Sequence, residues 1–351
     1  MQKTNTIFIL LALFGLTLLI GCTDENGMTT PSPTKPRGAA YRILVGNEGG
    51  FTYGNASLSV IDPTTGGVSE QIIQAANGRP LGDVLQSMTL LDGRLYLALN
   101  NSGRVEVIDT SDYGIIGSIT GLTSPRYVQQ AGANKLYVSD FQADALSVVD
   151  AARLEVTGTI PLAGWTEEML LVDTEMWVTN RYSDYVYVVD TATDTVRDSI
   201  EVAYGSGAIG RDAAGKVWVY CAGDLTGERD GGLYRINPAT QAVEQSFPLS
   251  SDLGLYPRLA FDAEGDTLFY LQDGLRVLPV GATQLPVEPL IPATGHNWYG
   301  VGYDAVADQL WLCDARDFQR RGEVVQYDRL GNMLGRYEAG VIPALVLVTG
   351  Q

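Results

Sequence analysis

The sequence predicts an all-β fold, a seven-bladed β-propeller, over residues 41–351. Three observations indicate this fold: a strand pattern of alternating apolar and polar residues recurs seven times, the repeats average about 44 residues, and no segment keeps a helical period. A four-stranded propeller blade takes ~40–45 residues, so seven repeats of this length fit one ring.

Each predicted blade contains a recognisable pair of strands. The second strand of a pair ends in Asp or Asn before a turn, as in residues 105–109 and 146–150. Its other copies lie at residues 58–62, 186–190, 233–237 and 324–328, with a degenerate copy at 275–278. The partner strands lie at residues 41–45, 95–99, 136–139, 176–179, 217–220, 268–271 and 310–313. A further strand precedes most pairs, as at residues 126–128.

The two ends of the repeat region predict how the ring closes. Residues 342–348 have the pattern of an innermost strand whose blade lacks its other strands. The pair that begins at Tyr41 lacks an innermost strand. We therefore expect the C-terminal strand to join the N-terminal blade, because an unpaired strand edge would otherwise remain beside the channel.

The first 40 residues have the composition of an export signal followed by a tether. Lys3 is the only charged residue before Cys22, and residues 7–20 are almost entirely apolar but too short for a comfortable membrane helix. We expect residues 1–21 to be a lipoprotein signal peptide. Residues 22–40, rich in Pro, Ser, Thr and Gly, are expected to be the lipidated cysteine and a flexible tether.

The end of the apolar stretch, residues 19–22, resembles a bacterial lipobox, in which the cysteine is lipidated and becomes the first mature residue. Asp24 and Glu25 resemble the surface-export signal of Bacteroidota lipoproteins. The resemblance implies a lipid anchor at Cys22, and a location at the outer membrane or the cell surface. Whether the protein faces outward or into the periplasm stays open.

The composition excludes several function classes. The chain has 23 Lys and Arg against 41 Asp and Glu, and a net charge of −18 argues against binding nucleic acid or anionic membrane surfaces. The single histidine, His296, excludes sites built on two or more histidines. No nucleophile elbow, Walker loop or dinucleotide fingerprint occurs in a suitable strand-to-helix context. We therefore expect no enzyme activity, no resident cofactor and no protein-only metal site.

Three groups of residues are expected to be structural. Asp62, Asp109, Asp150 and Asp190 recur with the blade, so turn capping explains them better than catalysis. A complete blade separates Cys221 from Cys313, so we expect two buried thiols and no disulfide. Four strand aromatics are expected in the core: Tyr127, Trp177, Trp218 and Trp311.

The phrases at residues 136–140 and 176–180 resemble the YVTN repeats of YncE-like seven-bladed propellers. A narrower family of Bacteroidota surface lipoproteins, which includes the corrinoid-binding BtuG branch, is resembled at residues 47–50, 54–59, 78–88, 100–103 and 125–127. The resemblance implies a propeller that captures a corrinoid and passes it to a TonB-dependent outer-membrane receptor.

Long loops rich in aromatic residues and arginine are expected on one face of the ring. Loops between the second and third strands share this face with the loops that lead into the innermost strands, and function on propellers resides in such loops. The candidate ligand-binding residues there are Glu48, Phe51, Tyr53, Arg79, Asp83, Arg126, Phe141, Trp165, Arg181, Tyr182, Tyr256, Arg258, His296, Trp298, Tyr299, Arg316 and Phe318.

These side chains suit a large ligand rich in amides, or a protein partner, because aromatic rings offer flat apolar area and arginine offers paired donors. The alternative for each aromatic is packing between blades. His296 is expected near the channel mouth, either as an axial ligand to a metal-containing ligand or as a loop histidine satisfied by backbone groups. If the face assignment holds, alanine at Trp298, Tyr182 and Arg126 should abolish capture and leave thermal stability nearly intact.

Three function classes remain at this point. The first is a surface lipoprotein that binds a cofactor-sized ligand on one face and passes it to an outer-membrane transporter. The second is a protein-interaction or envelope scaffold without a small ligand. The third, and least supported, is a hydrolase of the lactonase type, for which carboxylates such as Glu48, Asp83, Glu167 and Asp224 appear too scattered to hold a metal.

Overall fold

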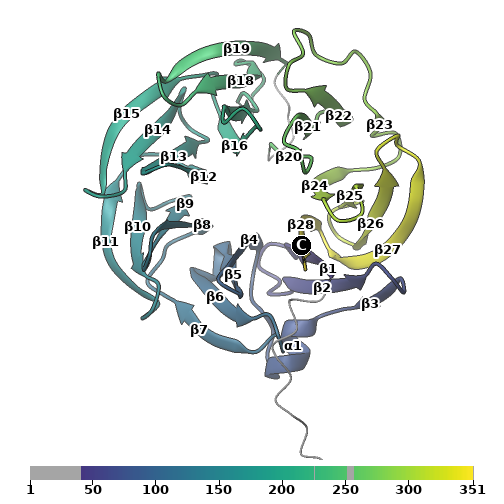
Figure 1. Ribbon diagram of the computed structural model, residues 1–351. Coiled ribbons are helices and arrows are strands. Elements are labelled where there is room, and N and C mark those ends of the chain that lie inside the picture. Colours follow the sequence, from purple (N-terminus) through teal and green to yellow (C-terminus); the bar gives the residue numbers. More distant parts are fainter. Residues whose placement is uncertain (1–40, 225, 251–256, 351) are drawn as a thin grey trace, which may run out of the picture. The chain divides into compact units, whose positions relative to one another are not determined.

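The computed structural model describes residues 41–224, 226–250 and 257–350. Within them the chain forms seven four-stranded antiparallel sheets, which stand as blades around a central axis (Figure 1). This arrangement confirms the predicted seven-bladed propeller. The expected signal peptide, lipidation site Cys22 and tether lie outside the described residues, and so does the candidate ligand residue Tyr256.

The strands of each blade follow one another along the chain, from the innermost to the outermost, in blades 2 to 7. Blade 2 contains β4 (Leu85–Leu91), β5 (Arg94–Leu99), β6 (Arg104–Asp109) and β7 (Ile115–Ile119). Blade 3 contains β8 (Pro125–Gly132), β9 (Lys135–Asp140), β10 (Ala145–Asp150) and β11 (Glu155–Pro161). Blade 4 contains β12 (Thr166–Val172), β13 (Glu175–Asn180), β14 (Tyr185–Asp190) and β15 (Thr195–Glu201). Blade 5 contains β16 (Ser206–Arg211), β17 (Val217–Cys221), β18 (Gly231–Asn237) and β19 (Ala242–Leu249). Blade 6 contains β20 (Leu259–Phe261), β21 (Thr267–Leu271), β22 (Gly274–Pro279) and β23 (Ile291–Pro292). Blade 7 contains β24 (Trp298–Asp304), β25 (Gln309–Asp314), β26 (Arg321–Asp328) and β27 (Met333–Val341).

Blade 1 is built from both ends of the ring. It contains β28 (Pro343–Thr349), β1 (Arg42–Asn47), β2 (Ser57–Asp62) and β3 (Gly67–Ser69), with β28 innermost. Val45 of β1 pairs antiparallel with Val346 of β28, and the pairing keeps one register from Arg42 to Gly46 before it shifts at Asn47. The predicted closure is therefore confirmed. Two short helices, α1 (Ile72–Asn77) and η1 (Asn100–Ser102), lie in loops of blades 1 and 2, and no helix among the described residues is long and apolar enough to span a membrane.

The hydrophobic core consists of clusters between neighbouring blades. Trp177, Trp218 and Trp311 have no exposed surface, as the sequence predicts. Tyr127 differs, because its ring packs against the cluster between blades 3 and 4 while its hydroxyl group reaches into the channel. Cys221 and Cys313 are buried free thiols, which confirms the expectation of no disulfide between them.

The recurrent aspartates cap turns, also as predicted. The Asp150 carboxylate accepts hydrogen bonds from the backbone N–H groups of Ala152 (2.9 Å) and Arg153 (3.0 Å). Asp190 binds the equivalent pair of N–H groups. These bonds lower the pKa of both carboxyl groups, since they favour the charged form.

A register shift near the start of the innermost strands positions the candidate site. In β4, for example, Leu85 pairs with Leu99 and Ser87 with Ala98, which leaves Gln86 without a partner on β5. A β-bulge of this kind re-aims the unpaired side chain. The same shift leaves Arg126, Glu167 and Tyr299 unpaired in β8, β12 and β24.

Candidate functional site on the loop face and in the channel

The long loops meet on one face of the ring, which we call the loop face. Loops after the second strand of a blade hydrogen-bond to the loops that lead into innermost strands: Phe141 N–H donates to the Ser124 carbonyl, and Arg181 N–H to the Trp165 carbonyl. The turns that join first to second strands and third to fourth strands lie on the opposite side, which we call the turn face. The sequence assigned these loop classes to their face correctly.

Aromatic side chains stand exposed on the loop face in three blades. Phe51 and Tyr53 of blade 1 are 67% and 80% exposed, and Tyr182 of blade 4 is 53% exposed. Phe318 of blade 7 is also exposed, and its ring meets the Tyr299 ring edge-on. Exposed aromatics gathered on one side of a folded domain are typical of a binding surface.

Trp165 connects this surface to the channel. Its ring contacts Phe141 and Tyr182, with centroids 4.3 and 5.4 Å apart, and its indole N–H donates to Glu167 (2.6 Å). A pocket of about 330 Å³ opens beside it, and the Arg229 guanidinium lies over the Tyr204 ring in this pocket. The pocket is lined by Trp165, Arg181, Tyr182, Tyr204, Gly223, Asp224, Thr226, Glu228 and Arg229.

The bulge residues form a buried ion pair at the channel. Arg126 donates to both carboxylate oxygens of Glu167 (2.7 Å each) and to the Gln86 side-chain oxygen (2.5 Å). Both charged side chains are only 2% exposed. The sequence placed Arg126 on the ligand face as an accessible fork, and this is wrong, because its guanidinium is already held by Glu167. Alanine at Arg126 is therefore not expected to leave stability intact.

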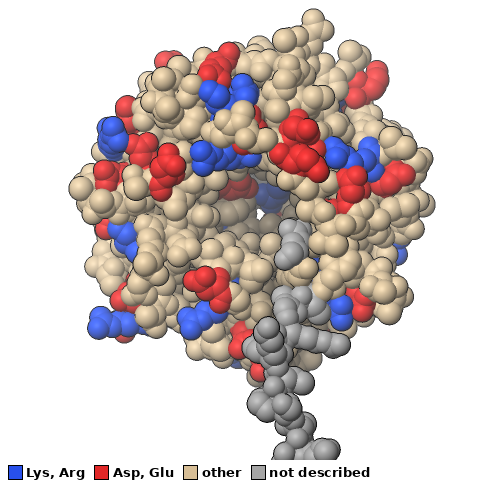
Figure 2. Space-filling view, in the orientation of Figure 1, with Lys and Arg blue, Asp and Glu red and all other residues tan. Residues whose placement is uncertain are grey.

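Arg258 spans the channel. It comes from blade 6, yet it donates to the Tyr127 hydroxyl of blade 3 (3.1 Å) and lies 4.0 Å from the Glu48 carboxylate of blade 1. Tyr299 donates a long hydrogen bond to Glu48 (3.4 Å). Blades 3 and 6 are not neighbours, so these side chains can meet only across the axis. Figure 2 shows acidic and basic side chains within the central opening of the ring.

The positive charge of Arg258 acts on two carboxyl groups in the channel, those of Glu48 and Glu168. Burial raises the pKa of Glu48 and of Glu168 to about 7, although the Arg258 charge opposes this rise. Glu168 accepts a hydrogen bond from the Ile209 N–H (3.1 Å). Glu167, Glu168, Gln86 and Tyr127 were not among the candidate ligand residues. Glu167 and Glu168 did give a signal in the sequence, since charged residues are unusual at the start of an innermost strand, but that signal does not show which side chains meet.

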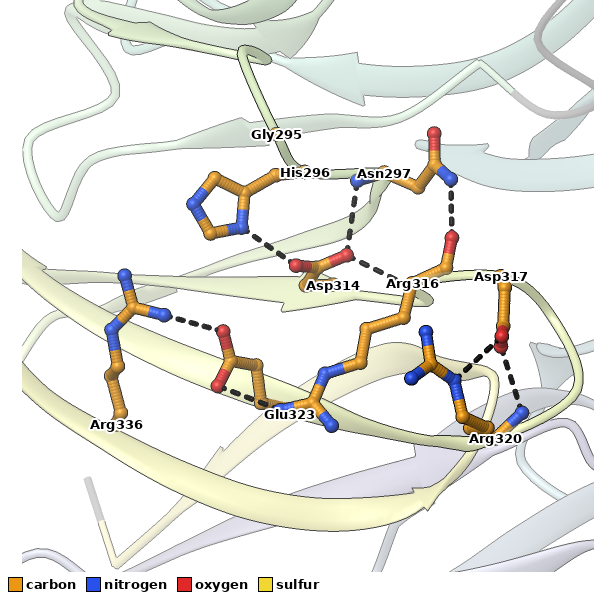
Figure 3. A pocket seen from close by; sticks show the side chains of 9 residues that line it. All are labelled: Gly295, His296, Asn297, Asp314, Arg316, Asp317, Arg320, Glu323 and Arg336. Atoms are coloured by element: carbon orange, nitrogen blue, oxygen red, sulfur yellow. Dashed lines mark hydrogen bonds and ion pairs between the residues drawn. The ribbon is translucent and has the colours of Figure 1, made fainter.

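His296 lies in a separate pocket of about 650 Å³ on blade 7 (Figure 3). Its Nδ1 is 2.6 Å from the Asp314 carboxylate, and its ring stacks on Trp298 with centroids 4.3 Å apart. The expectation that backbone groups satisfy this histidine is therefore wrong, because its partner is a side chain. The contact with Asp314 fixes Nδ1 as the partnered nitrogen.

His296, Asp314 and Glu323 are the one group of three metal-ligating side chains found among the described residues, with ligand atoms within 4.8 Å of one another. Arg336 and Arg316 hold the two oxygens of Glu323, at 2.7 and 3.1 Å. A metal ion would have to displace both guanidinium groups. The cluster is better described as an ion-pair network that fixes the blade 7 loops.

The other candidate residues divide between structure and surface. Asp83 accepts hydrogen bonds from the Thr52 N–H and the Asn101 amide, so it holds loops together. Arg79 pairs with the buried Glu106 (2.9 Å). Trp298 packs among the core residues between blades 6 and 7, and its indole N–H donates to the Pro292 carbonyl (3.0 Å). We therefore expect alanine at Trp298 to lower stability, in contrast to the prediction from the sequence.

The chain belongs to the family described as a domain of unknown function, DUF5074, whose model matches residues 41–318. No curated protein matches the chain. Among solved structures, a quinonprotein alcohol dehydrogenase-like protein of Bacteroides thetaiotaomicron superimposes with a TM-score of 0.69 at 12% identity, covering 88% of this chain and 78% of that one. The periplasmic gluconolactonase PpgL of Pseudomonas aeruginosa gives 0.66 at 15% identity, covering 88% and 99%. At such identities the likeness extends to the fold alone.

Proposed function

We propose that the protein is a lipid-anchored ligand-capture protein, which binds a cofactor-sized ligand on its loop face and passes it to an outer-membrane transporter. The observation that carries the proposal is the set of exposed aromatics around the channel: Phe51, Tyr53, Tyr182 and Phe318. Large apolar rings left in water are costly unless something covers them, and rings beside arginine suit a broad, rigid ligand with polar edges.

A corrinoid is the first ligand to test, since the sequence resembles the corrinoid-binding branch of surface propellers. Calorimetric titration of the purified protein with cyanocobalamin and cobinamide should give saturable binding at one site. If the cobalt absorption band shifts and the shift is lost in His296→Gln, the free Nε2 of His296 has become an axial ligand. No heat with either compound would reject the corrinoid and direct the search to other ligands, or to outer-membrane proteins captured by the tethered ring.

Alanine at Tyr53 and Tyr182 separates binding from folding. Both rings are more than half exposed, so their removal should weaken capture at least tenfold with little change in melting temperature. Val243→Ala, on the outermost strand β19, is the matched control and should bind normally. Capture that is unchanged in the Tyr53→Ala/Tyr182→Ala variant would place the ligand elsewhere on the ring.

The hydrolase alternative has less support. Glu48 and Glu167 do converge on the channel, contrary to the expectation of scattered carboxylates, but they face Arg258 and Arg126. Among the residues described, the channel carboxylates do not form a group of three ligand atoms close enough to share a metal ion. Asp83 and Asp224 lie in loops outside this cluster, where backbone N–H groups bind their carboxylates.

A further inference from the structure

The most exposed large aliphatic side chains of the ring gather in blade 7. Among the described residues, five large aliphatic side chains are at least half exposed: Val287 in blade 6, and four in blade 7. We call the four in blade 7 the rim patch: Val306, Leu330, Met333 and Leu334. The other exposed aliphatics, Val68, Ile116, Val196 and Val243, are each less than half exposed and lie one to a blade.

The rim patch lies toward the turn face. Val306 belongs to the turn between β24 and β25, and Leu330 to the turn between β26 and β27. Arg329 ties the two turns together, because it pairs with Asp308 (3.5 Å). Met333 and Leu334 follow the second turn directly, at the start of β27. The patch is therefore made of neighbouring segments of one blade.

The chain enters the ring beside this patch. Tyr41 immediately precedes β1, and its hydroxyl group hydrogen-bonds to Asp304. Asp304 also caps the turn that carries Val306, whose N–H lies 3.0 Å from the carboxylate. Tyr41, the first described residue of the ring, therefore lies on the turn face, next to the rim patch and opposite the exposed aromatics.

We propose that the rim patch rests on the surface of the lipid bilayer, so that the loop face is directed away from the membrane. The inference rests on the lipid anchor of the proposed function. Only 19 residues, 22–40, separate the ring from this anchor, and a segment of that length spans at most ~65 Å even when fully extended, so the ring stays near the bilayer. A contact too weak to hold a free protein is then sufficient, because the anchor makes it intramolecular.

The chemistry of the patch fits neutral lipid. Leucine, methionine and valine insert into the boundary between headgroups and acyl chains. Aspartates surround the patch at positions 304, 308 and 328, and the whole chain carries a charge of −18, so anionic headgroups would be repelled. Phosphatidylcholine vesicles are therefore the appropriate probe.

The test compares lipid contact at the two faces. The chain from Cys22 onward contains every described residue of the ring, and Cys22 can be coupled to a maleimide phospholipid in phosphatidylcholine vesicles. A benzophenone amino acid replaces Leu330 on the rim patch or Tyr53 on the loop face, and crosslinking to labelled phosphatidylcholine is measured. Leu330 should crosslink at least fivefold more than Tyr53. Equal crosslinking, or more at Tyr53, would overturn the proposal.

A matched pair of variants shows whether the apolar side chains cause the contact. Serine at Leu330, Met333 and Leu334 should abolish preferential crosslinking from a benzophenone at position 306, whereas serine at Val196 and Val243 should not. All five side chains are exposed, so both variants should fold, as circular dichroism would verify. Crosslinking to a second copy of the chain in place of lipid would also overturn the proposal. Chemical coupling replaces natural lipidation, so mass spectrometry of the cell-made protein tests the anchor separately.

Discussion

Because Arg126 is buried, its replacement is expected to affect the stability of the fold. Its guanidinium and the Glu167 carboxylate neutralise each other at the channel with almost no exposed surface. Arg126→Ala would leave Glu167 buried and uncompensated, a loss typically of about 3–5 kcal/mol in the free energy of unfolding. Chemical denaturation would measure it.

The matched control for this substitution is Arg320→Ala. Arg320 pairs with Asp317 on the surface, and its side chain is 74% exposed. A surface pair of this kind contributes about 0–1 kcal/mol. Similar losses in the two variants would contradict a buried, structural role for Arg126.

Glu48 and Glu168 predict how stability depends on pH. Burial raises the pKa of both to about 7 in the folded protein, from 4.5. Between these values the folded state binds more protons than the unfolded state, so stability should fall as pH rises from about 5 to 8. The stabilisation is fully present below pH 4.5 and is lost above about pH 7, on the order of 3 kcal/mol for each group.

Burial is the largest cause of the raised pKa at both carboxyl groups, and neighbouring side chains modify it. Arg258, Arg126, Glu167 and Tyr299 act on Glu48, while Arg258, Glu167 and Tyr127 act on Glu168. The double variant Glu48→Gln/Glu168→Gln should flatten the decline in melting temperature between pH 5 and 8, whereas the exposed Glu264→Gln should not. An unchanged slope in the double variant would refute the assignment.

At the level of single elements, β28 is the strand on which the ring depends. It is the innermost strand of blade 1, pairs with β1 along its length and contacts β24 of blade 7. Removal of residues 343–351 should abolish cooperative unfolding, because it exposes the edge of β1 and the interface between blades 7 and 1. Differential scanning calorimetry would show a broad transition or none, in contrast to removal of Gln351 alone. A sharp transition in the shorter chain would contradict this.

The bulges in the innermost strands explain why the channel cluster could not be predicted from the sequence. Strict alternation would send Arg126 and Tyr127 to opposite faces of their blade. Both reach the channel because these two residues of β8 lie opposite a single residue of β9. Glu167 and Glu168 have the same arrangement in β12. A one-residue change in register decides which side chains meet, and periodicity alone does not record it.

For the whole molecule, the sequence was sufficient for the architecture and insufficient for the site. Blade number, ring closure, turn caps and the loop face follow from local patterns that recur in each blade. Contacts such as that of Arg258 with Tyr127 join blades 6 and 3 across the axis, and depend on the size and depth of the channel. No local pattern contains that information, so Arg126 and Trp298 were taken for surface residues.

The placement of β28 also has a consequence for the order of events in the life of the chain. Among the strands of the ring, the one that seals it, β28 (Pro343–Thr349), is the last to be synthesised. Each of blades 2 to 7 can form its own hairpins as it is made, but blade 1 stays open to partners until β28 has left the ribosome. The ring can therefore close only after all its other strands exist, and until then the edge of blade 1 can pair with a wrong partner.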